Sequence, residues 1–172
     1  MKSRQHLLLV LALIGIGVCS RLLPHPPNFT PVGAIALLGG TYIKDKRLAF
    51  SLPLVILFIS DLFISGLHSQ MPFVYLSFLI ITALGRVILA NRVSTFRVLG
   101  TSLLGSILFF IITNLGCWWL SYEHSVAGFL LCFTLALPFF TNTILGDLFF
   151  VSLFFVSYFL VSRKLKLLAN VE

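Results

Sequence analysis

The chain has 172 residues, of which 59% are hydrophobic and 10% are charged, and its formal net charge is +7. A soluble domain of this size cannot bury so much apolar surface, so the composition excludes the soluble classes and predicts a polytopic membrane protein. The positive charge does not indicate nucleic-acid binding, because the cations stand in short clusters between apolar segments and not on one polar surface.

Seven apolar segments follow one another along the chain. Lys2 and Arg4 precede the first one, as in a signal peptide, but the residues around Cys19 do not form a small-residue cleavage site, so an uncleaved helix is predicted. A full crossing needs about 20 residues, so the second segment is short, and Pro138 interrupts the sixth. We expect one integral-membrane domain over residues 1–172, with apolar segments at 6–23, 31–43, 48–66, 72–90, 98–120, 125–140 and 143–162.

The distribution of Lys and Arg indicates how many segments cross the membrane. If the N-terminus is cytoplasmic and the first five segments cross, the clusters at 2–4, 44–47 and 86–97 all lie inside. The cluster at 163–166 also lies inside if one of the last two segments does not cross. We therefore predict an all-α membrane protein with six transmembrane helices, a short re-entrant or interfacial helix at 125–140, and both termini in the cytoplasm.

Under this topology, polar residues gather on the outer face, where Arg21 is the only Lys or Arg. The loop that follows Arg21 contains Pro24, Pro26, Pro27 and Pro31, and its stiffness suits the wall of a binding site better than a spacer. The candidate substrate-binding residues are Arg21, His25, Asn28, Thr30, Asp61, His68, Asn114, Trp118, Tyr122, Asn142 and Asp147.

Asp61 is the most informative of these residues, because a carboxylate inside a membrane helix usually faces a cavity or a partner. It lies about five residues from the outer end of its segment, roughly 7–8 Å below the surface. Two interpretations stay open. Asp61 is either a pocket acid or partner of Arg21, or a structural group that caps a neighbouring helix or binds the hydroxyl of Ser60 or Ser65.

Asp147 is expected in the first turn of the last helix, where the helix dipole favours a negative charge, although it also borders the outer face. On the fifth segment, Asn114 and Trp118 share a helix face because they are four residues apart. One of Trp118 and Trp119 is expected to point inward while its neighbour meets lipid. Aromatic side chains beside polar groups also suit a flat organic ligand.

Small residues form stripes on two helices, where they permit close helix packing. One stripe contains Ser102, Ser106, Thr113 and Cys117. The other contains Ala12, Gly15 and Cys19, and it could alternatively face a partner subunit.

Nothing in the sequence indicates catalysis or a resident metal. There is no GxSxG, HExxH or Walker-type motif, and the three cysteines have no CxxC spacing. His6 lies at the inner edge, and the outer histidines, His25, His68 and His124, have no ligand spacing. We expect no enzyme activity, no cofactor and no bound metal.

Several motifs resemble a family of small bacterial integral-membrane proteins that is similar to the substrate-binding S components of energy-coupling-factor (ECF) vitamin transporters. The resemblance covers nearly the whole chain. It is carried by the run His25–Gly40, the Ser60-Asp-Leu62 step, Pro72–Phe78, Thr113–Gly116 and Pro138–Leu148.

This resemblance implies a six-helix protein of the bacterial inner membrane that binds a vitamin or similar micronutrient, cobalamin among them, from outside. Delivery would use a separate transmembrane subunit and two ATPases. The chain departs from the S-component pattern in its first helix, which lacks the Ala-xxx-Ala docking stripe, and it begins Met1-Lys2 where cobalt and nickel members have Met-His. Cys117 is the best-placed residue for contact with cobalamin.

Two other classes of function stay open. A small channel or ion-coupled carrier predicts a continuous wet path past Asp61. A structural or assembly subunit of a membrane complex predicts that Asp61 and Asn28 tolerate substitution.

Overall fold

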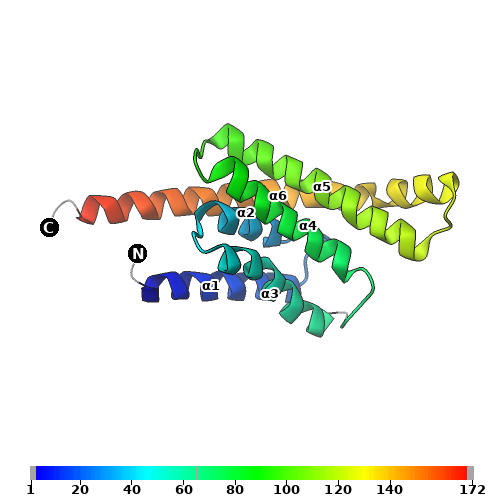
Figure 1. The fold of residues 1–172 in the computed structure, drawn as a ribbon, viewed down its shortest axis with the longest axis horizontal. Coiled ribbons are helices and arrows are strands. Elements are labelled where there is room, and N and C mark those ends of the chain that lie inside the picture. The colour runs from blue at the N-terminus through cyan, green and yellow to red at the C-terminus, as the bar shows by residue number, and fades with distance from the viewer. Residues whose placement is uncertain (1–2, 65, 170–172) are drawn as a thin grey trace.

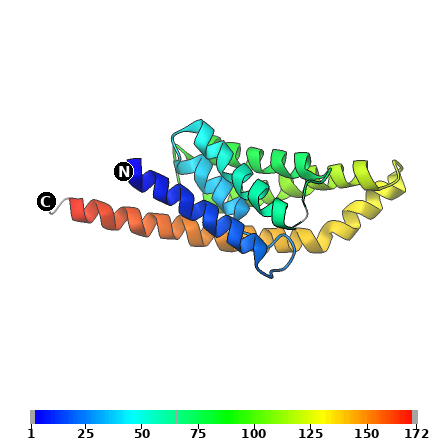
Figure 2. The same cartoon turned by 90° about the horizontal axis from the view of Figure 1, so that it is seen from below.

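The computed structural model describes residues 3–64 and 66–169, with side chains described over 10–64 and 66–163. Consecutive helices of the described chain run antiparallel, so α1 begins and α6 ends at the same end of the bundle (Figures 1 and 2). The elements are α1 (Ser3–Leu22), α2 (Val32–Tyr42), α3 (Lys46–Ile64), α4 (Met71–Leu84), the π-helical turn η1 (Gly85–Leu89), α5 (Thr95–Ser121) and α6 (Val126–Ala169).

The predicted class, an all-α membrane protein, is confirmed. Four stretches are long and apolar enough to cross a membrane: α3, α4 with η1, α5, and α6 as far as Arg163. α1 is apolar over Val10–Leu22, the part of the helix whose side chains the structure describes. α2 has only 11 residues, a length of about 16 Å, so it is too short to span a bilayer by itself.

The predicted break between segments 125–140 and 143–162 is wrong. α6 is one continuous helix of 44 residues with Pro138 inside it, and Figure 2 shows that it bends in its first half. A proline removes one backbone donor and bends a helix, but neighbouring helices can keep the helix continuous through it. Six antiparallel helices therefore return the chain to its starting end without a re-entrant segment.

The α5–α6 hairpin extends beyond the other helices at the end opposite to the start of α1 (Figure 1). α6 has a length of about 66 Å, roughly twice the thickness of the hydrocarbon core of a bilayer. Its exposed side chains include Leu131, Leu145 and Leu153, as expected of a surface that faces lipid.

α2 forms the centre of the bundle. Residues 31–41 are all buried. At its C-terminal end, Arg86 donates hydrogen bonds to the carbonyl oxygens of Ile43 (3.1 Å) and Lys44 (2.7 Å). These bonds satisfy the carbonyl oxygens of the two residues that follow the helix, and they place a cation where the helix dipole favours it.

Two glycines let α2 approach the helix formed by α4 and η1 backbone to backbone. A Cβ atom at Gly40 would overlap the carbonyl oxygen of Thr82, and one at Gly85 would overlap that of Leu37. A rigid backbone cannot move aside as a side chain can, so only glycine fits at these two positions without a shift of the helices.

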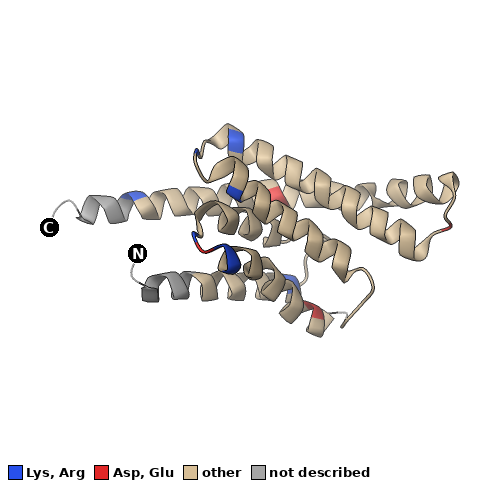
Figure 3. Ribbon diagram, in the orientation of Figure 1, with Lys and Arg blue, Asp and Glu red and all other residues tan. Residues whose placement is uncertain are grey.

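The described cations lie mainly at the end of the bundle where α1 begins and α6 ends (Figure 3). They sit in the turns from α2 to α3 and from η1 to α5, and near the end of α6. Arg21, at the end of α1, is the one described Lys or Arg at the opposite end. The side chains of Lys2, Arg4, His6, Lys164 and Lys166, which also entered the predicted topology, lie outside the described part of the chain.

The two stripes of small residues differ in their surroundings. On α5, Ser102 and Ser106 are buried, so this stripe packs inside the bundle as predicted. On α1, Ala12, Gly15 and Cys19 are exposed. The prediction that this second stripe packs within the chain is therefore wrong, because α1 contacts its neighbours through a different face.

Candidate small-molecule binding site

The loop between α1 and α2 is an ordered wall at the end of the bundle away from the cation clusters. Its turn is closed by a hydrogen bond from the Phe29 amide to the Pro26 carbonyl oxygen (3.0 Å), and Asn28 adopts a left-handed conformation (φ 65°) that asparagine tolerates. The Phe29 ring packs against the rings of Phe149 and Phe150, with centroids 6.0 and 5.5 Å away. The loop is therefore anchored to α6.

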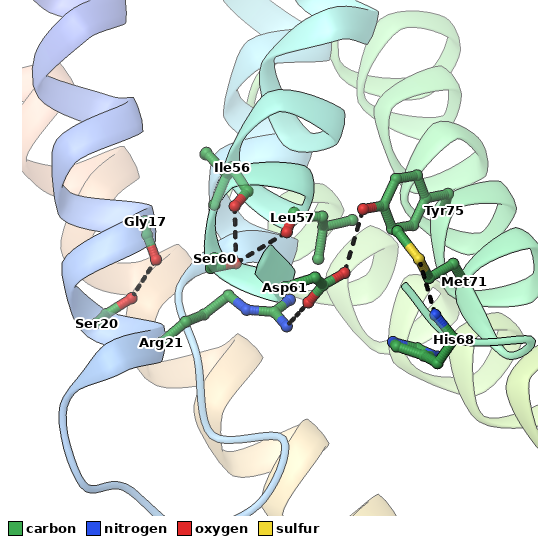
Figure 4. Close-up of polar contacts among 10 residues, drawn as sticks. All are labelled: Gly17, Ser20, Arg21, Ile56, Leu57, Ser60, Asp61, His68, Met71 and Tyr75. Atoms are coloured by element: carbon green, nitrogen blue, oxygen red, sulfur yellow. Dashed lines mark hydrogen bonds and ion pairs between the residues drawn. The ribbon is translucent and has the colours of Figure 1, made fainter. Parts of the chain in front are cut away.

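Beneath this loop, Arg21 and Asp61 form an ion pair (Figure 4). Nη2 of Arg21 lies 2.5 Å from Oδ1 of Asp61, and the hydroxyl of Tyr75 donates to Oδ2 at 3.1 Å. The Asp61 side chain is 4% exposed and that of Arg21 is 19% exposed. Of the interpretations proposed for Asp61, the structure therefore shows the pairing with Arg21.

The hydroxyl of Ser60 does not bind Asp61. It is directed at the carbonyl oxygens of Ile56 and Leu57, at 2.8 and 3.0 Å. Ser65, the other hydroxyl considered, lies outside the described residues.

A cavity of about 320 Å³ lies between the ion pair, the loop and the inner faces of α4, α5 and α6. Val74, Phe78, Ile81 and Phe109 supply much of its apolar wall. His25 and Asn28 are exposed, so the cavity reaches the surface at the loop. It brings together seven of the predicted site residues: Arg21, His25, Asn28, Thr30, Asp61, His68 and Asp147.

Asp147 lies at the inner limit of this cavity and is 8% exposed. Its Oδ2 accepts a hydrogen bond from the hydroxyl of Ser106 (2.7 Å). Its Oδ1 lies against Gly33, so close that a Cβ atom at residue 33 would overlap it. The prediction that Asp147 stands at the start of its own helix is wrong, because α6 is continuous there; the helix N-terminus that it meets is that of α2.

A second cavity of about 290 Å³ adjoins the first and shares Asn28, Phe109 and Thr143 with it. Asn114 and Tyr122 line this second cavity, together with Cys117, Cys132 and several phenylalanine rings. The predicted site residues therefore divide between two neighbouring spaces.

Trp118 and Asn142 line neither of these two cavities. Nε1 of Trp118 donates to the Glu123 carbonyl oxygen (3.1 Å), and its ring packs against Phe129, so it closes the tip of the α5–α6 hairpin. Trp118 is half-buried and Trp119 is 60% exposed. This confirms that one of the two tryptophans points inward while the other faces outward.

Four residues of the site were not predicted. Tyr75 binds Asp61, Ser106 binds Asp147, Phe109 lines both cavities, and Gly33 makes room for the Asp147 carboxylate. The contact between Tyr75 and Asp61 could have been predicted from the sequence. Asp61 lies near the outer end of one predicted helix and Tyr75 near the outer start of the next, so the two share a depth in the membrane.

The sequence matches one described family over residues 1–168, under the description "Family of unknown function (DUF6580)". The chain belongs to this family. No curated protein and no solved structure matches it. Membership of DUF6580 gives the chain no activity or ligand, so a function for it has to be argued from the two cavities and the charges around them.

Proposed function

We propose that this protein binds a vitamin or a related small micronutrient from the outer side of the bacterial inner membrane, for uptake with separate energising subunits. The observation that carries the proposal is the cavity beneath the Pro-rich loop. It combines an apolar wall with a few converging polar groups, as small-molecule sites do, and it lies at the end of the bundle opposite to the cation clusters, which by the positive-inside tendency is the outer end.

Polar groups in this cavity have hydrogen-bonding capacity left for a ligand. Arg21 has five N–H donors, and in the described part of the chain only the bond to Asp61 uses one. At the inner limit, Oδ1 of Asp147 has no hydrogen-bond donor among the described residues, whereas Oδ2 is bound to Ser106. A ligand that offers an acceptor to Arg21 and a donor to Asp147 would satisfy both ends.

The volume of the cavity favours a small ligand. About 320 Å³ is the space of roughly ten water-sized groups, and the adjoining cavity of about 290 Å³ enlarges it only about twofold. Cobalamin is many times larger than either space, so we propose a smaller micronutrient.

The position of α2 favours a cavity that is closed at its inner end over a small channel. The cavity ends at Gly33 and Asp147, and below them the buried helix α2 fills the centre of the bundle. A channel needs a wet path past Asp61 to the other end. Because the sequence contains no Walker-type motif, uptake driven by ATP requires other chains, as in transporters that use S components.

A ligand screen with a matched pair of variants tests the proposal. The protein is purified in detergent, its melting temperature is measured with vitamins and their precursors, and hits are confirmed by native mass spectrometry. Val74→Trp fills the cavity, whereas Leu76→Trp on the same helix places the ring on an exposed position. We expect a ligand that stabilises the wild type and Leu76→Trp but not Val74→Trp.

The absence of any such ligand at micromolar concentration would refute the binding function. Flux through liposomes that contain this protein alone would favour the channel instead. Stable co-purification with a larger complex, together with tolerance of substitutions at Asp61 and Asn28, would favour the assembly subunit.

A further inference from the structure

Two cysteines meet across the α5–α6 hairpin. Cys117 lies near the end of α5 and Cys132 near the start of α6. The two thiols are in hydrogen-bonding contact, and both side chains line the second cavity. Both are free thiols in the structure, as is the exposed Cys19 on α1. The hairpin therefore holds a pair of thiols side by side at the wall of a cavity.

Contacts on both sides of the pair fix the register of the two helices. Towards the hairpin tip, the ring of Trp118 packs against that of Phe129, with centroids 5.6 Å apart. Towards the bundle, the Cys132 thiol is directed at the Asn114 carbonyl oxygen, at 3.5 Å. Because these contacts bracket the pair, Cys117 faces Cys132 in the packed hairpin and does not meet it by chance.

The pair lies in the part of the molecule that extends beyond the other helices (Figure 1). This end is opposite to the cation clusters (Figure 3), so by the positive-inside tendency it is the outer end. The outer side of a bacterial inner membrane is oxidising, and disulfides form and persist there. Cys117 is half-buried whereas Cys132 is 2% exposed, so an oxidant that enters from the cavity meets Cys117 first.

We propose that Cys117 and Cys132 are a site of thiol–disulfide exchange that closes to an intrachain disulfide on the outer side of the membrane. The oxidant is a disulfide of that compartment. The Cys117 thiolate attacks one sulfur of the oxidant and releases the other as a thiol. Cys132 then attacks the Cys117 sulfur of this mixed disulfide and releases the second thiol. Two electrons and two protons pass from the pair to the oxidant.

The disulfide would tie together the two helices that form the second cavity. Asn114 from α5 and Ala136 and Phe140 from α6 line this cavity beside the pair, and a covalent link restricts how far the helices can separate. The inference rests on the outward orientation in the proposed function, and it does not depend on the ligand.

The test counts reactive thiols in the whole chain. Cells that contain the protein are quenched in acid, which stops thiol exchange, and the denatured chain is alkylated before and after reduction and weighed by mass spectrometry. Before reduction we expect one reactive thiol, that of Cys19, and after reduction all three. Cys117→Ser should show two thiols before reduction. Cys19→Ser is the matched control and should show none. A blocked pair of thiols that persists in Cys117→Ser would overturn the proposal.

A second measurement separates the chemistry of the pair from its orientation. The purified chain is reduced and then exposed in detergent to oxidised glutathione, which should remove the thiols of Cys117 and Cys132 and leave no glutathione attached. Glutathione that stays on Cys117, or a pair that remains free both here and in cells, would overturn the proposal. A pair that closes here but is free in cells would support the exchange site and contradict the outward orientation. Neither measurement contains a ligand, so a failed ligand screen leaves both unaffected.

Discussion

The guanidinium of Arg21, at the end of α1, lies 2.5 Å from the carboxylate of Asp61 on α3. The pair joins the first helix to the third at the end of the bundle where the loop from α1 to α2 closes the cavity. Because Asp61 also accepts a bond from Tyr75 on α4, three helices meet at one carboxylate. Their arrangement around the cavity therefore depends on this group.

Arg21→Gln and Asp61→Asn should each lower the free energy of unfolding by about 3 kcal/mol, because each leaves one member of the pair without its charge partner. The double variant should lose less than the sum, with a coupling of about 1–2 kcal/mol. Unfolding in SDS or by heat in detergent measures this cycle. Tyr75→Phe, which removes one hydrogen bond, is expected to cost only about 1 kcal/mol, and strict additivity of the two charge variants would show that the pair is not coupled.

Gly40→Ala and Gly85→Ala should each destabilise the protein by about 2–3 kcal/mol, because the added methyl group meets a backbone carbonyl of the neighbouring helix. Gly100→Ala on α5 is the control, since a Cβ atom there has nothing within 4 Å. It should be neutral or stabilising by up to about 1 kcal/mol, because alanine favours helix more than glycine does. Equal effects at all three positions would contradict the backbone-to-backbone packing of α2.

Phe29→Ala should loosen the loop over the cavity while the bundle stays folded. The ring contacts with Phe149 and Phe150 are lost, and hydrogen exchange measured by mass spectrometry should become faster at the Phe29 amide, which bonds to Pro26. Phe63→Ala on α3, where the side chain is 74% exposed, should leave exchange in the loop unchanged. Protection of the loop in Phe29→Ala as strong as in the wild type would show that other contacts hold it.

The orientation in the membrane can be measured by labelling cysteines in a variant that lacks Cys19, Cys117 and Cys132. Ser69, before α4, and Asn91, after η1, are both exposed and lie at opposite ends of the bundle. A membrane-impermeant maleimide should label Ser69→Cys in intact cells and Asn91→Cys only after permeabilisation. The reverse pattern would place the cavity on the cytoplasmic side and contradict uptake from outside.

The apolar segments could be predicted from the sequence because hydrophobicity over a stretch of about 20 residues is a strong signal in membrane proteins. The effect of Pro138 could not, because a proline inside a helix either ends or bends it according to how the neighbours pack. This one difference moved Asp147 from a helix start to the middle of α6. The π-helical turn at Gly85–Leu89 also gave no clear signal in the sequence.

The sequence predicted at which end of the bundle the site residues lie, but it did not predict which of their side chains point into a cavity. Charge distribution and segment ends placed Arg21, Asp61 and His68 at one end of the bundle, and they line one cavity there. Trp118 was expected beside them because it shares a helix face with Asn114, but it lies a full turn nearer the hairpin tip and packs against Phe129. Which side chain closes a tip and which lines a cavity depends on the packing of α5 against α6.

The central claim is that the cavity opens to the outer side and is filled there by a small molecule, and labelling of Thr30→Cys tests it most directly. Thr30 lines the cavity and is half-buried. In intact cells with the cysteine-free background, an impermeant maleimide should react with Thr30→Cys, and a ligand found by the thermal screen should slow this reaction at least about tenfold. The same ligand should leave the labelling of Ser69→Cys unchanged. Labelling of Thr30→Cys only after permeabilisation, or at a rate that no stabilising compound alters, would contradict the claim.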